Sequence, residues 1–503
     1  MESALMMLEG FKDVITLQNL LSVFVGSALG IAIGALPGLN ASMGIALLLP
    51  LTYGMSALPA IVLLLSIYCG AIYGGSITAI LLRTPGTTAA ACTVLDGYEM
   101  AQNGEPGRAL SMAATASFIG GIFSVIVLIF LSPPLARMAL MFGPAEYFAL
   151  CFFGLSIISS LSAENMVKGL ISAVIGLLLG TVGLDIVTGV PRFTFDIVEL
   201  LNGISFIPVL IGLFAVSQIF ITVEKEIKEL GGVKQAISGL TISLKDLVSV
   251  TGTLIRSSII GTLVGILPGA GATMSSFISY NEARRWSKTP EKFGTGCLEG
   301  IAAPEAANNA ATGGAMVPLL SLGIPGSETT AILIGAFMIQ GLRPGPLLFR
   351  ENPELVYGLF AGMVLANIAF FVLGMLGARL FSQVTKIPNR VLVPMILILA
   401  TIGSFAENNS LSDVFLMFSF GVVGYFMRKF EFPIAPLVLA LVLGPMAESN
   451  FRRGLIISAG EWTTFFTRPI SLVFLALGFA TLIMPFIRMI RDHRKTREVP
   501  PSA

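Results

Sequence analysis

The chain has 503 residues, of which 55% are hydrophobic and 12% are charged, and its net charge at pH 7 is +1. Soluble domains usually carry about 25% charged residues, and the mean hydropathy of +0.88 also lies far outside that class. These values exclude a soluble globular protein, and the near-neutral charge gives no indication of a nucleic-acid surface. We therefore predict an all-α polytopic membrane protein.

Apolar stretches of membrane-spanning length recur along the whole chain. A transmembrane helix needs about 20 apolar residues to cross the hydrocarbon core. With the shorter apolar stretches, we expect roughly ten to twelve spans, some of them broken or re-entrant. Examples of such stretches are residues 17–36, 110–131, 167–184, 199–222, 355–380, 411–427 and 465–487.

Two Pro-Gly breaks in the first half of the chain recur in the second half. Residues 34–43 (GALPGLNASM) correspond to residues 265–274 (GILPGAGATM), and the break at 85–86 corresponds to the break at 325–326. Lipid cannot satisfy the backbone groups that a broken helix frees, so such breaks survive where protein or a polar cavity surrounds them. Paired breaks in two halves predict a duplicated transporter with its site at the breaks.

The repeat predicts five parts along the chain. The start of the chain lacks the basic residues and the cleavage site of a secretory signal, so we expect it to be retained. The predicted parts are an N-terminal interfacial segment at 1–16, a first transmembrane repeat at 17–222, a polar linker at 223–248, a second transmembrane repeat at 249–487 and a basic cytoplasmic tail at 488–503.

The distribution of basic residues predicts that the two repeats are inverted. Basic residues follow the first break of the second half, at 284, 285, 288 and 292, whereas the corresponding residues 51–63 carry no charge. Basic loops favour the cytoplasm, and the basic tail therefore places the C-terminus there. The arginines that do not fit this scheme are Arg192, Arg452 and Arg453.

Small hydroxyl and amide residues follow each break and form the predicted substrate site. A helix that restarts at a polar cap presents free N–H groups and the positive end of its dipole, which suit a carboxylate. Alternatively, these residues serve only helix packing, as small residues commonly do in membranes. The predicted substrate-binding residues are Asn40, Ser42, Thr87, Thr88, Thr273, Ser275, Asn308, Asn309, Ser327 and Thr329.

The expected coupling ion is Na⁺, held by unwound carbonyl groups and by two glutamates that could instead carry protons. Carbonyl oxygens of a broken helix are ligands for Na⁺, and ionisable groups at membrane depth are usually functional. Arg83 and Arg343 could pair with an anionic substrate, but we favour a place for them at the membrane interface. The predicted ion-binding residues are Pro37, Gly38, Pro268, Gly269, Glu305 and Glu328.

The sequence does not predict an enzyme. It contains no HExxH motif, its one histidine, His493, lies in the tail, and no nucleophile has a base beside it. The four cysteines have no metal-ligand spacing and are interpreted as packing residues. We expect no cofactor and no metal other than transported Na⁺.

These motifs resemble the large membrane subunit, the TctA-type permease, of the tripartite tricarboxylate transporter family. The resemblance implies uptake of a carboxylate, such as citrate or another tri- or dicarboxylate, across the bacterial cytoplasmic (inner) membrane, driven by an ion gradient. It also implies a small four-helix membrane subunit and a periplasmic solute-binding protein as partners. The motifs that carry it are residues 34–41, 73–81, 84–87, 96–98, 265–269, 304–309 and 323–327, spread over almost the whole chain.

Two other interpretations stay open at this point. A proton-coupled carboxylate permease that acts without a binding protein would need Glu305 or Glu328 to titrate during transport. An intramembrane enzyme acting on lipid substrates would need a catalytic pair, and the sequence offers none.

Overall fold

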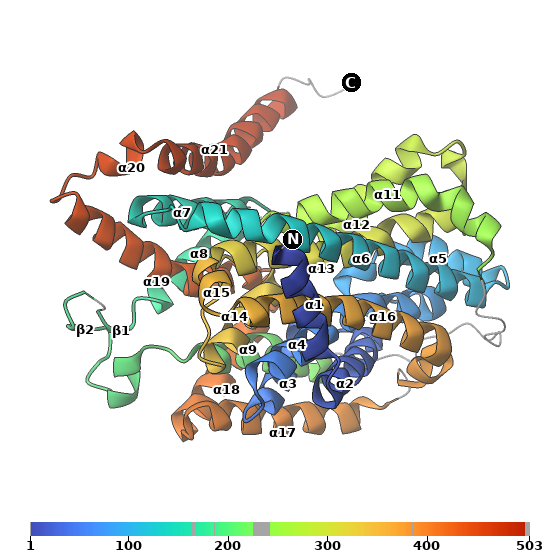
Figure 1. Cartoon of the computed structure of the whole chain (residues 1–503), viewed down its shortest axis with the longest axis horizontal. Helices are drawn as coiled ribbons and strands as arrows, with labels where there is room; N and C mark the ends of the chain where they lie inside the picture. The colour runs from blue at the N-terminus through green and yellow to red at the C-terminus, as the bar shows by residue number, and fades with distance from the viewer. Residues whose placement is uncertain (1, 162–165, 186, 225–241, 385–386, 498–503) are drawn as a thin grey trace. The chain divides into compact units, whose positions relative to one another are not determined.

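The computed structural model describes residues 2–161, 166–185, 187–224, 242–384 and 387–497, and these residues form helices almost throughout (Figure 1). The strands found within these ranges are β1 (Gly183–Leu184) and β2 (Pro191–Arg192), which pair antiparallel in a short hairpin. The predicted all-α class is therefore confirmed. Most of the predicted linker and the last residues of the predicted tail lie outside the described residues.

The chain divides into two compact units, and each unit combines a segment from the first half with a segment from the second half. Unit 1 consists of Met1–Leu140 and Phe206–Phe426, and unit 2 consists of Met141–Ser205 and Met427–Ala503. Each predicted repeat therefore contributes to both units. The boundaries and the inverted orientation of the repeats stay predictions.

Unit 1 is built around two buried helices, α4 and α13. Residues 59–81 of α4 and residues 300–321 of α13 are all buried. The helices of this unit are α1 (Glu2–Val14), α2 (Leu17–Ala35), α3 (Ala41–Leu48), η1 (Leu49–Thr52), α4 (Ala57–Leu82), η2 (Thr88–Ala90), α5 (Thr93–Gln102), α6 (Pro106–Ala139), α9 (Phe206–Ile211), η4 (Gly212–Val216), α10 (Ser217–Glu224), α11 (Leu244–Ile266), α12 (Gly271–Trp286), η5 (Pro290–Lys292), α13 (Leu298–Leu322), α14 (Glu328–Ile339), α15 (Pro346–Glu351), α16 (Pro353–Val384), α17 (Asn389–Asn408) and most of α18 (Leu411–Lys429).

Glycines bring the neighbouring helices onto α4 and α13. A Cβ added at Gly34 of α2 would overlap the carbonyl oxygen of Ala71 on α4. One added at Gly265 of α11 would lie 2.6 Å from the carbonyl oxygen of Ala311 on α13. Small residues allow such close approach of helix backbones in membrane proteins. Corresponding glycines in the two halves therefore make the same kind of helix contact.

Unit 2 is a smaller helical unit that carries the β1–β2 hairpin. In it α7 packs along α21, and α19 packs on both α7 and α8. Phe465 is buried beside Phe148 and Phe451, with ring centroids 5.2 Å and 5.1 Å away. The helices of this unit are α7 (Pro144–Leu161), α8 (Met166–Leu179), η3 (Val198–Asn202), α19 (Ile434–Ile457), α20 (Thr464–Thr467) and α21 (Pro469–Arg497).

Nine helices within the described residues are long and apolar enough to cross a membrane, so the prediction of a multi-pass membrane protein is confirmed. Shorter apolar helices, among them α7, α8 and α14, accompany them. The central helix α13 is not among the nine. The nine candidate spans are Leu17–Ala35, Ala57–Leu82, Pro106–Ala139, Phe206–Glu224, Leu244–Ile266, Pro353–Val384, Arg390–Asn408, Leu411–Lys429 and Ile434–Ile457.

Three predicted apolar stretches differ from the helices observed. The stretch at 167–184 is helical only as far as Leu179, where α8 ends, and its last residues form β1. The stretch at 199–222 becomes a membrane-length helix only from Phe206, because η3 ends before Gly203, whose φ of +85° does not continue a helix. The stretch at 465–487 is divided at Arg468, between α20 and α21. Proline lacks an N–H and favours the first position of a helix, and Pro469 begins α21.

Candidate functional site

The first break of each half interrupts a helix at its Pro-Gly pair, as the sequence predicts. Residues 36–40 separate α2 from α3, with Gly38 at φ +90°. Residues 267–270 separate α11 from α12, with Gly269 at φ +84°. Residues with a side chain rarely adopt such a φ, which explains the glycine at both positions.

The second break of each half follows a central helix, and the two breaks differ in how the next helix is capped. Residues 83–87 separate α4 from η2, and residues 323–327 separate α13 from α14. The hydroxyl of Ser327 accepts a hydrogen bond from the N–H of Thr330 at 3.2 Å, and the two residues form a capping box. Thr87 makes no side-chain cap, and its buried Oγ1 has no hydrogen-bond partner among the described residues.

The two breaks of each half lie against each other. A Cβ at Gly86 would overlap the carbonyl oxygen of Gly34, and a Cβ at Gly326 would lie 2.8 Å from the carbonyl oxygen of Gly265. In the second half the N–H of Gly269 also donates to the carbonyl oxygen of Gly326 at 3.0 Å. Each half therefore forms one compact pair of breaks.

Polar side chains also join the first break of the first half to the second break of the second half. Ser42 Oγ donates to Glu328 Oε1 at 3.0 Å and lies 2.8 Å from Thr329 Oγ1. Asn40 Nδ2 donates to the same Glu328 oxygen at 3.4 Å. We call Asn40, Ser42, Glu328 and Thr329 the acidic break contact.

The other two breaks meet through a contact between two hydroxyl groups. Thr88 Oγ1, after the second break of the first half, lies 2.9 Å from Thr273 Oγ1, after the first break of the second half. Thr87 precedes Thr88 and is 3% exposed. We call Thr87, Thr88 and Thr273 the hydroxyl break contact. Residues predicted from separate motifs thus come together in two pairs across the halves.

The remaining predicted substrate residues lie on or beside α13. Asn308 Nδ2 donates to the carbonyl oxygen of Ala89 at 3.3 Å, next to the hydroxyl break contact. Asn309 Nδ2 donates to Asn308 Oδ1 at 2.8 Å, and the buried Asn309 Oδ1 has no partner in the part of the chain that the structure describes. Ser275 Oγ lies within hydrogen-bonding distance of two backbone carbonyl oxygens, on α12 and α13, so its hydroxyl fastens these two helices together.

The two glutamates predicted to bind ions lie in different surroundings. Glu305 is fully buried on α13, where it accepts hydrogen bonds from Thr93 Oγ1 at 2.5 Å and from Ser117 Oγ at 2.9 Å. Glu328 is partly exposed at the start of α14, in the acidic break contact. Glu305 and Glu328 accept these hydrogen bonds from different residues. The two carboxylates are therefore two separate acidic positions.

The two candidate arginines are exposed, and Arg83 belongs to the second break of the first half. Arg83 is exposed at the end of α4, with its guanidinium 5.4 Å from the centre of the Tyr98 ring. Arg343 is exposed in the loop between α14 and α15. Arg83 therefore stacks on an aromatic ring of α5. The place of both arginines at the membrane interface stays a prediction.

Three residues that contact the site carry no sequence motif. Tyr68 OH lies 3.4 Å from Ser327 Oγ, and Thr93 and Ser117 bind Glu305 as described above. Each stands as a single polar residue among apolar or small neighbours. A buried hydroxyl needs a partner, so the polarity of these positions is the signal that could have found them.

Asp96 of α5 is a structural carboxylate within unit 1. It is fully buried and accepts hydrogen bonds from the N–H groups of Gly294, Gly296 and Cys297 at 2.9 to 3.1 Å. Tyr280 OH donates to it at 2.8 Å. It therefore holds the loop that leads into the central helix α13.

Replacing Asp96 with asparagine is expected to destabilise this loop. Hydrogen bonds to a charged group contribute about 1.5–3 kcal/mol each, and the asparagine NH₂ would point a donor at other donors. We expect a lower apparent melting temperature of the detergent-solubilised protein, measured by intrinsic fluorescence. Glu99→Gln, on the same helix, is the matched control, and an equal effect of both changes would contradict this role for Asp96.

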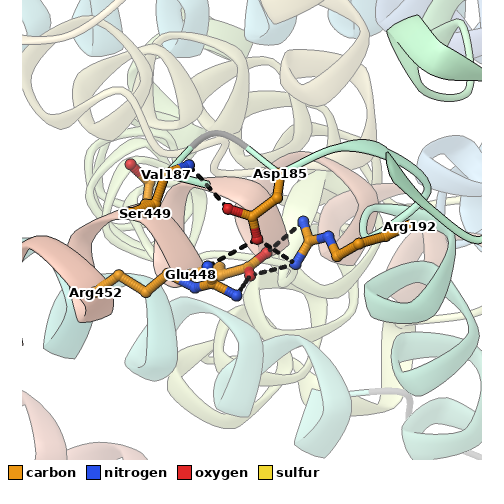
Figure 2. Close-up of a pocket in the computed structure, with 6 residues that line it drawn as sticks. All are labelled: Asp185, Val187, Arg192, Glu448, Ser449 and Arg452. Carbon is orange, nitrogen blue, oxygen red and sulfur yellow. Dashed lines mark hydrogen bonds and ion pairs between the residues drawn. The ribbon is translucent and has the colours of Figure 1, made fainter. Parts of the chain in front are cut away.

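Unit 2 contains a balanced cluster of two carboxylates and two arginines around a small pocket (Figure 2). Asp185 Oδ2 lies 2.7 Å from Arg452 and 3.3 Å from Arg192, and Glu448 Oε1 lies 2.8 Å and 2.6 Å from the same arginines. Figure 2 shows the two acidic groups between the two guanidinium groups. These ion pairs fasten the β1–β2 hairpin to α19. Because the two positive and two negative charges cancel, the cluster has no net charge that would attract an anionic substrate.

The hydrogen bonds and ion pairs of Asp185 predict how the stability of the folded protein depends on pH. The N–H groups of Thr188 and Val187, together with Arg452, lower the pKa of Asp185 from 3.8 to about 2. The ionised group therefore stabilises the folded protein above pH 4, and this stabilisation is lost as the pH falls towards 2. We expect Asp185→Asn to lower the melting temperature by the same amount at pH 7 and pH 5. The difference from wild type should shrink below pH 4, and a difference that grows there would contradict the assignment.

A helical multi-pass protein whose paired breaks bring polar residues of its two halves together belongs to the class of membrane transporters. The model of the family described as "Tripartite tricarboxylate transporter TctA family" matches residues 20–439. The chain belongs to this family. It is therefore a membrane component of a tripartite transporter and not an enzyme, and it acts with other components.

Two relatives in Agrobacterium vitis support this membership. An uncharacterized 52.8 kDa protein in the TAR-I ttuC′ 3′ region is 41% identical over 485 residues, which cover 96% of this chain and 96% of that protein. An uncharacterized protein in the TAR-II ttuC′ 3′ region is 41% identical over 234 residues, which cover 46% of this chain and 97% of that protein. No solved structure matches the chain.

Proposed function

We propose that this chain is the permease subunit that moves a carboxylate into the bacterial cytoplasm, driven by an inward Na⁺ gradient. The substrate is citrate or another tri- or dicarboxylate, and a periplasmic solute-binding protein delivers it. A small four-helix membrane subunit completes the transporter, which lies in the cytoplasmic membrane with the C-terminus of this chain inside. Membership of the tripartite tricarboxylate transporter TctA family supports the substrate class and the number of partners.

The observation that carries this proposal is the contact of the four breaks across the halves. Ser42 meets Glu328 and Thr329, and Thr88 meets Thr273. Hydroxyl groups, a carboxylate and interrupted helices near one another supply groups for both an anion and a cation. Two ligands of opposite charge at one group of breaks are what symport of a carboxylate with Na⁺ requires.

The test is uptake of radiolabelled citrate into vesicles that contain this chain, its small membrane partner and its binding protein. We expect uptake only with an inward Na⁺ gradient and only with the binding protein present. Succinate and malate, supplied in the same vesicles, test shorter carboxylates. Absence of uptake of all three substrates under a Na⁺ gradient and under a pH gradient would contradict the proposal.

A proton-coupled permease without a binding protein is the competing function, and the buried Glu305 is the observation that favours it. It predicts uptake driven by a pH gradient in Na⁺-free buffer. The same vesicles, prepared with and without the binding protein, separate the two functions. Uptake driven by a pH gradient alone would show that the coupling ion is H⁺ and not Na⁺.

A further inference from the structure

The membrane span Phe206–Glu224 contains a π turn, η4 (Gly212–Val216). The N–H of Ser217 bonds to the carbonyl oxygen of Gly212, five residues earlier, which is the hydrogen bond of a π turn. In an α-helix the same N–H would bond to Leu213, four residues earlier. Here the hydroxyl of Ser217 donates to the Leu213 carbonyl oxygen instead. One side chain thus satisfies the acceptor that the wider turn frees.

Two glycines make room for this wider turn. A Cβ added at Gly212 would overlap the carbonyl oxygen of Met417 on α18. One added at Gly424 of α18 would lie 2.9 Å from the Cβ of Ser217 and 3.0 Å from the carbonyl oxygen of Leu213. The backbone of the π turn therefore packs directly on α18. Such turns are rare and occur often at functional sites, so we asked which residue this one displaces.

The π turn is followed by Gln218, whose side chain reaches the first break of the first half. One extra residue in a turn rotates the following residues by about 100° around the helix axis. The Nε2 atom of Gln218 lies 2.8 Å from the place that a Cβ would take at Gly38. The same span packs on α3 and, through α9, on α14, the two helices of the acidic break contact. A polar residue from outside the break motifs thus lies on a break.

The corresponding break of the second half is held in a different way. There the N–H of Gly269 donates to the carbonyl oxygen of Gly326 at 3.0 Å. Among the described residues no such backbone bond joins Gly38 to Gly86, which are the equivalent pair of the first half. Gly38 is also exposed, and the Gln218 beside it is partly exposed. The first break of the first half is therefore the one at which a side chain takes over the support.

We propose that Gln218 is a positioning residue of the transport site: placed by the π turn, its side chain packs on Gly38 and holds the first break of the first half in place. Asn40 caps α3 directly after this break, and Ser42 lies in the first turn of α3. Movement of Gly38 would therefore displace both residues of the acidic break contact. Their part in uptake rests on the proposed function, whereas the packing of Gln218 on Gly38 does not.

A cysteine beside Gly38 measures the opening of the break directly. The chain carries Leu39→Cys with its four native cysteines replaced by alanine, and the transporter is solubilised in detergent with its partners so that a water-soluble maleimide reaches both faces. Gln218→Ala should raise the labelling rate about tenfold, because the break opens more often without the packed side chain. Ala270→Cys, at the corresponding position of the second half, is the matched control, and its labelling rate should not respond to Gln218→Ala.

The length of the side chain separates packing from polarity. Gln218→Met keeps the length and should label like wild type, whereas Gln218→Asn is one methylene shorter and should label like Gln218→Ala. In vesicles, Gln218→Ala and Gln218→Asn should raise the KM for citrate about tenfold and leave the maximal rate nearly unchanged, because the binding groups are displaced. Val223→Ala, exposed on α10, is the control and should change neither quantity. Each variant is first shown to be folded by its elution profile in detergent.

The outcomes distinguish this inference from the proposed function. If Gln218→Ala leaves the labelling rate unchanged, or if Gln218→Met behaves like Gln218→Ala, the packing on Gly38 does not hold the break and the inference is overturned. If labelling rises while the KM stays at the wild-type value, the break moves without displacing the site, and the positioning role is wrong. If wild-type vesicles take up no carboxylate under any gradient, the proposed function fails, while the labelling rates still decide what Gln218 does at Gly38.

Discussion

Glu305→Gln is expected to lower Na⁺-driven uptake roughly tenfold or more while the protein keeps its folded stability. Glutamine has nearly the same shape and retains one oxygen that can accept from Thr93 or Ser117. It carries no charge and cannot exchange a proton. Because Glu305 is fully buried on a central helix, its carboxylate has a large desolvation cost that helix packing alone does not require.

Uptake and melting temperature must be measured on the same preparation to interpret this variant. Glu351→Gln, at the exposed end of α15, is the control and should transport like wild type. Glu305→Leu should lose stability as well as uptake, since two buried hydroxyls would lose their acceptor. Normal uptake by Glu305→Gln would show that Glu305 serves only as a structural hydrogen-bond acceptor and not in transport.

Gly86→Ala is expected to abolish uptake and to reduce the yield of folded protein. The added methyl group would overlap the carbonyl oxygen of Gly34 and lie 3.0 Å from the Cα of Gly75. Both are backbone atoms of packed helices, so they cannot rotate away as a side-chain tip would. Overpacking of this kind costs about 1–3 kcal/mol, and here it would also separate the two breaks of the first half.

The equivalent position in the second half gives an internal comparison. A methyl group at Gly326 would lie 2.8 Å from the carbonyl oxygen of Gly265, so Gly326→Ala should have a similar effect. Gly252→Ala on α11 is the control, because no atom lies within 4 Å of the added carbon. The quantities to measure are the monodisperse fraction in detergent and citrate uptake. Wild-type behaviour of Gly86→Ala would show that the breaks need not lie so close.

The sequence predicts the breaks well because their cause is local. Proline lacks a donor and glycine adopts positive φ, so both interrupt a helix in any surroundings. Gly38 and Gly269 have the positive φ that this reasoning requires. The membrane class was equally accessible, since it depends on composition and on the length of apolar stretches.

The pairing of the breaks could not be predicted from the sequence. Ser42 and Glu328, or Thr88 and Thr273, are far apart in the chain, and no local pattern says which breaks will meet. Ser275 has the same residue type and spacing as the site residues, yet its hydroxyl binds backbone carbonyls between two helices. Only the packing of the helices decides whether such a hydroxyl group lies in the site or binds a neighbouring backbone.

Two of the three arginines that did not fit the predicted topology have a physical explanation. Arg192 and Arg452 form ion pairs with Asp185 and Glu448 in unit 2. The tendency of basic loops to stay in the cytoplasm applies to lysines and arginines counted along the sequence. We expect arginines neutralised within the fold to be weak indicators of orientation.

Unit 2 is built from two segments that lie far apart in the chain, and this has a consequence for biogenesis. Residues 141–205 belong to unit 2 but are synthesised long before its other segment, which begins at Met427. Gly176 of α8, for example, packs directly on the backbone of Leu437 of α19, a helix made near the end of translation. Early helices of this unit must therefore wait in the bilayer without their final neighbours.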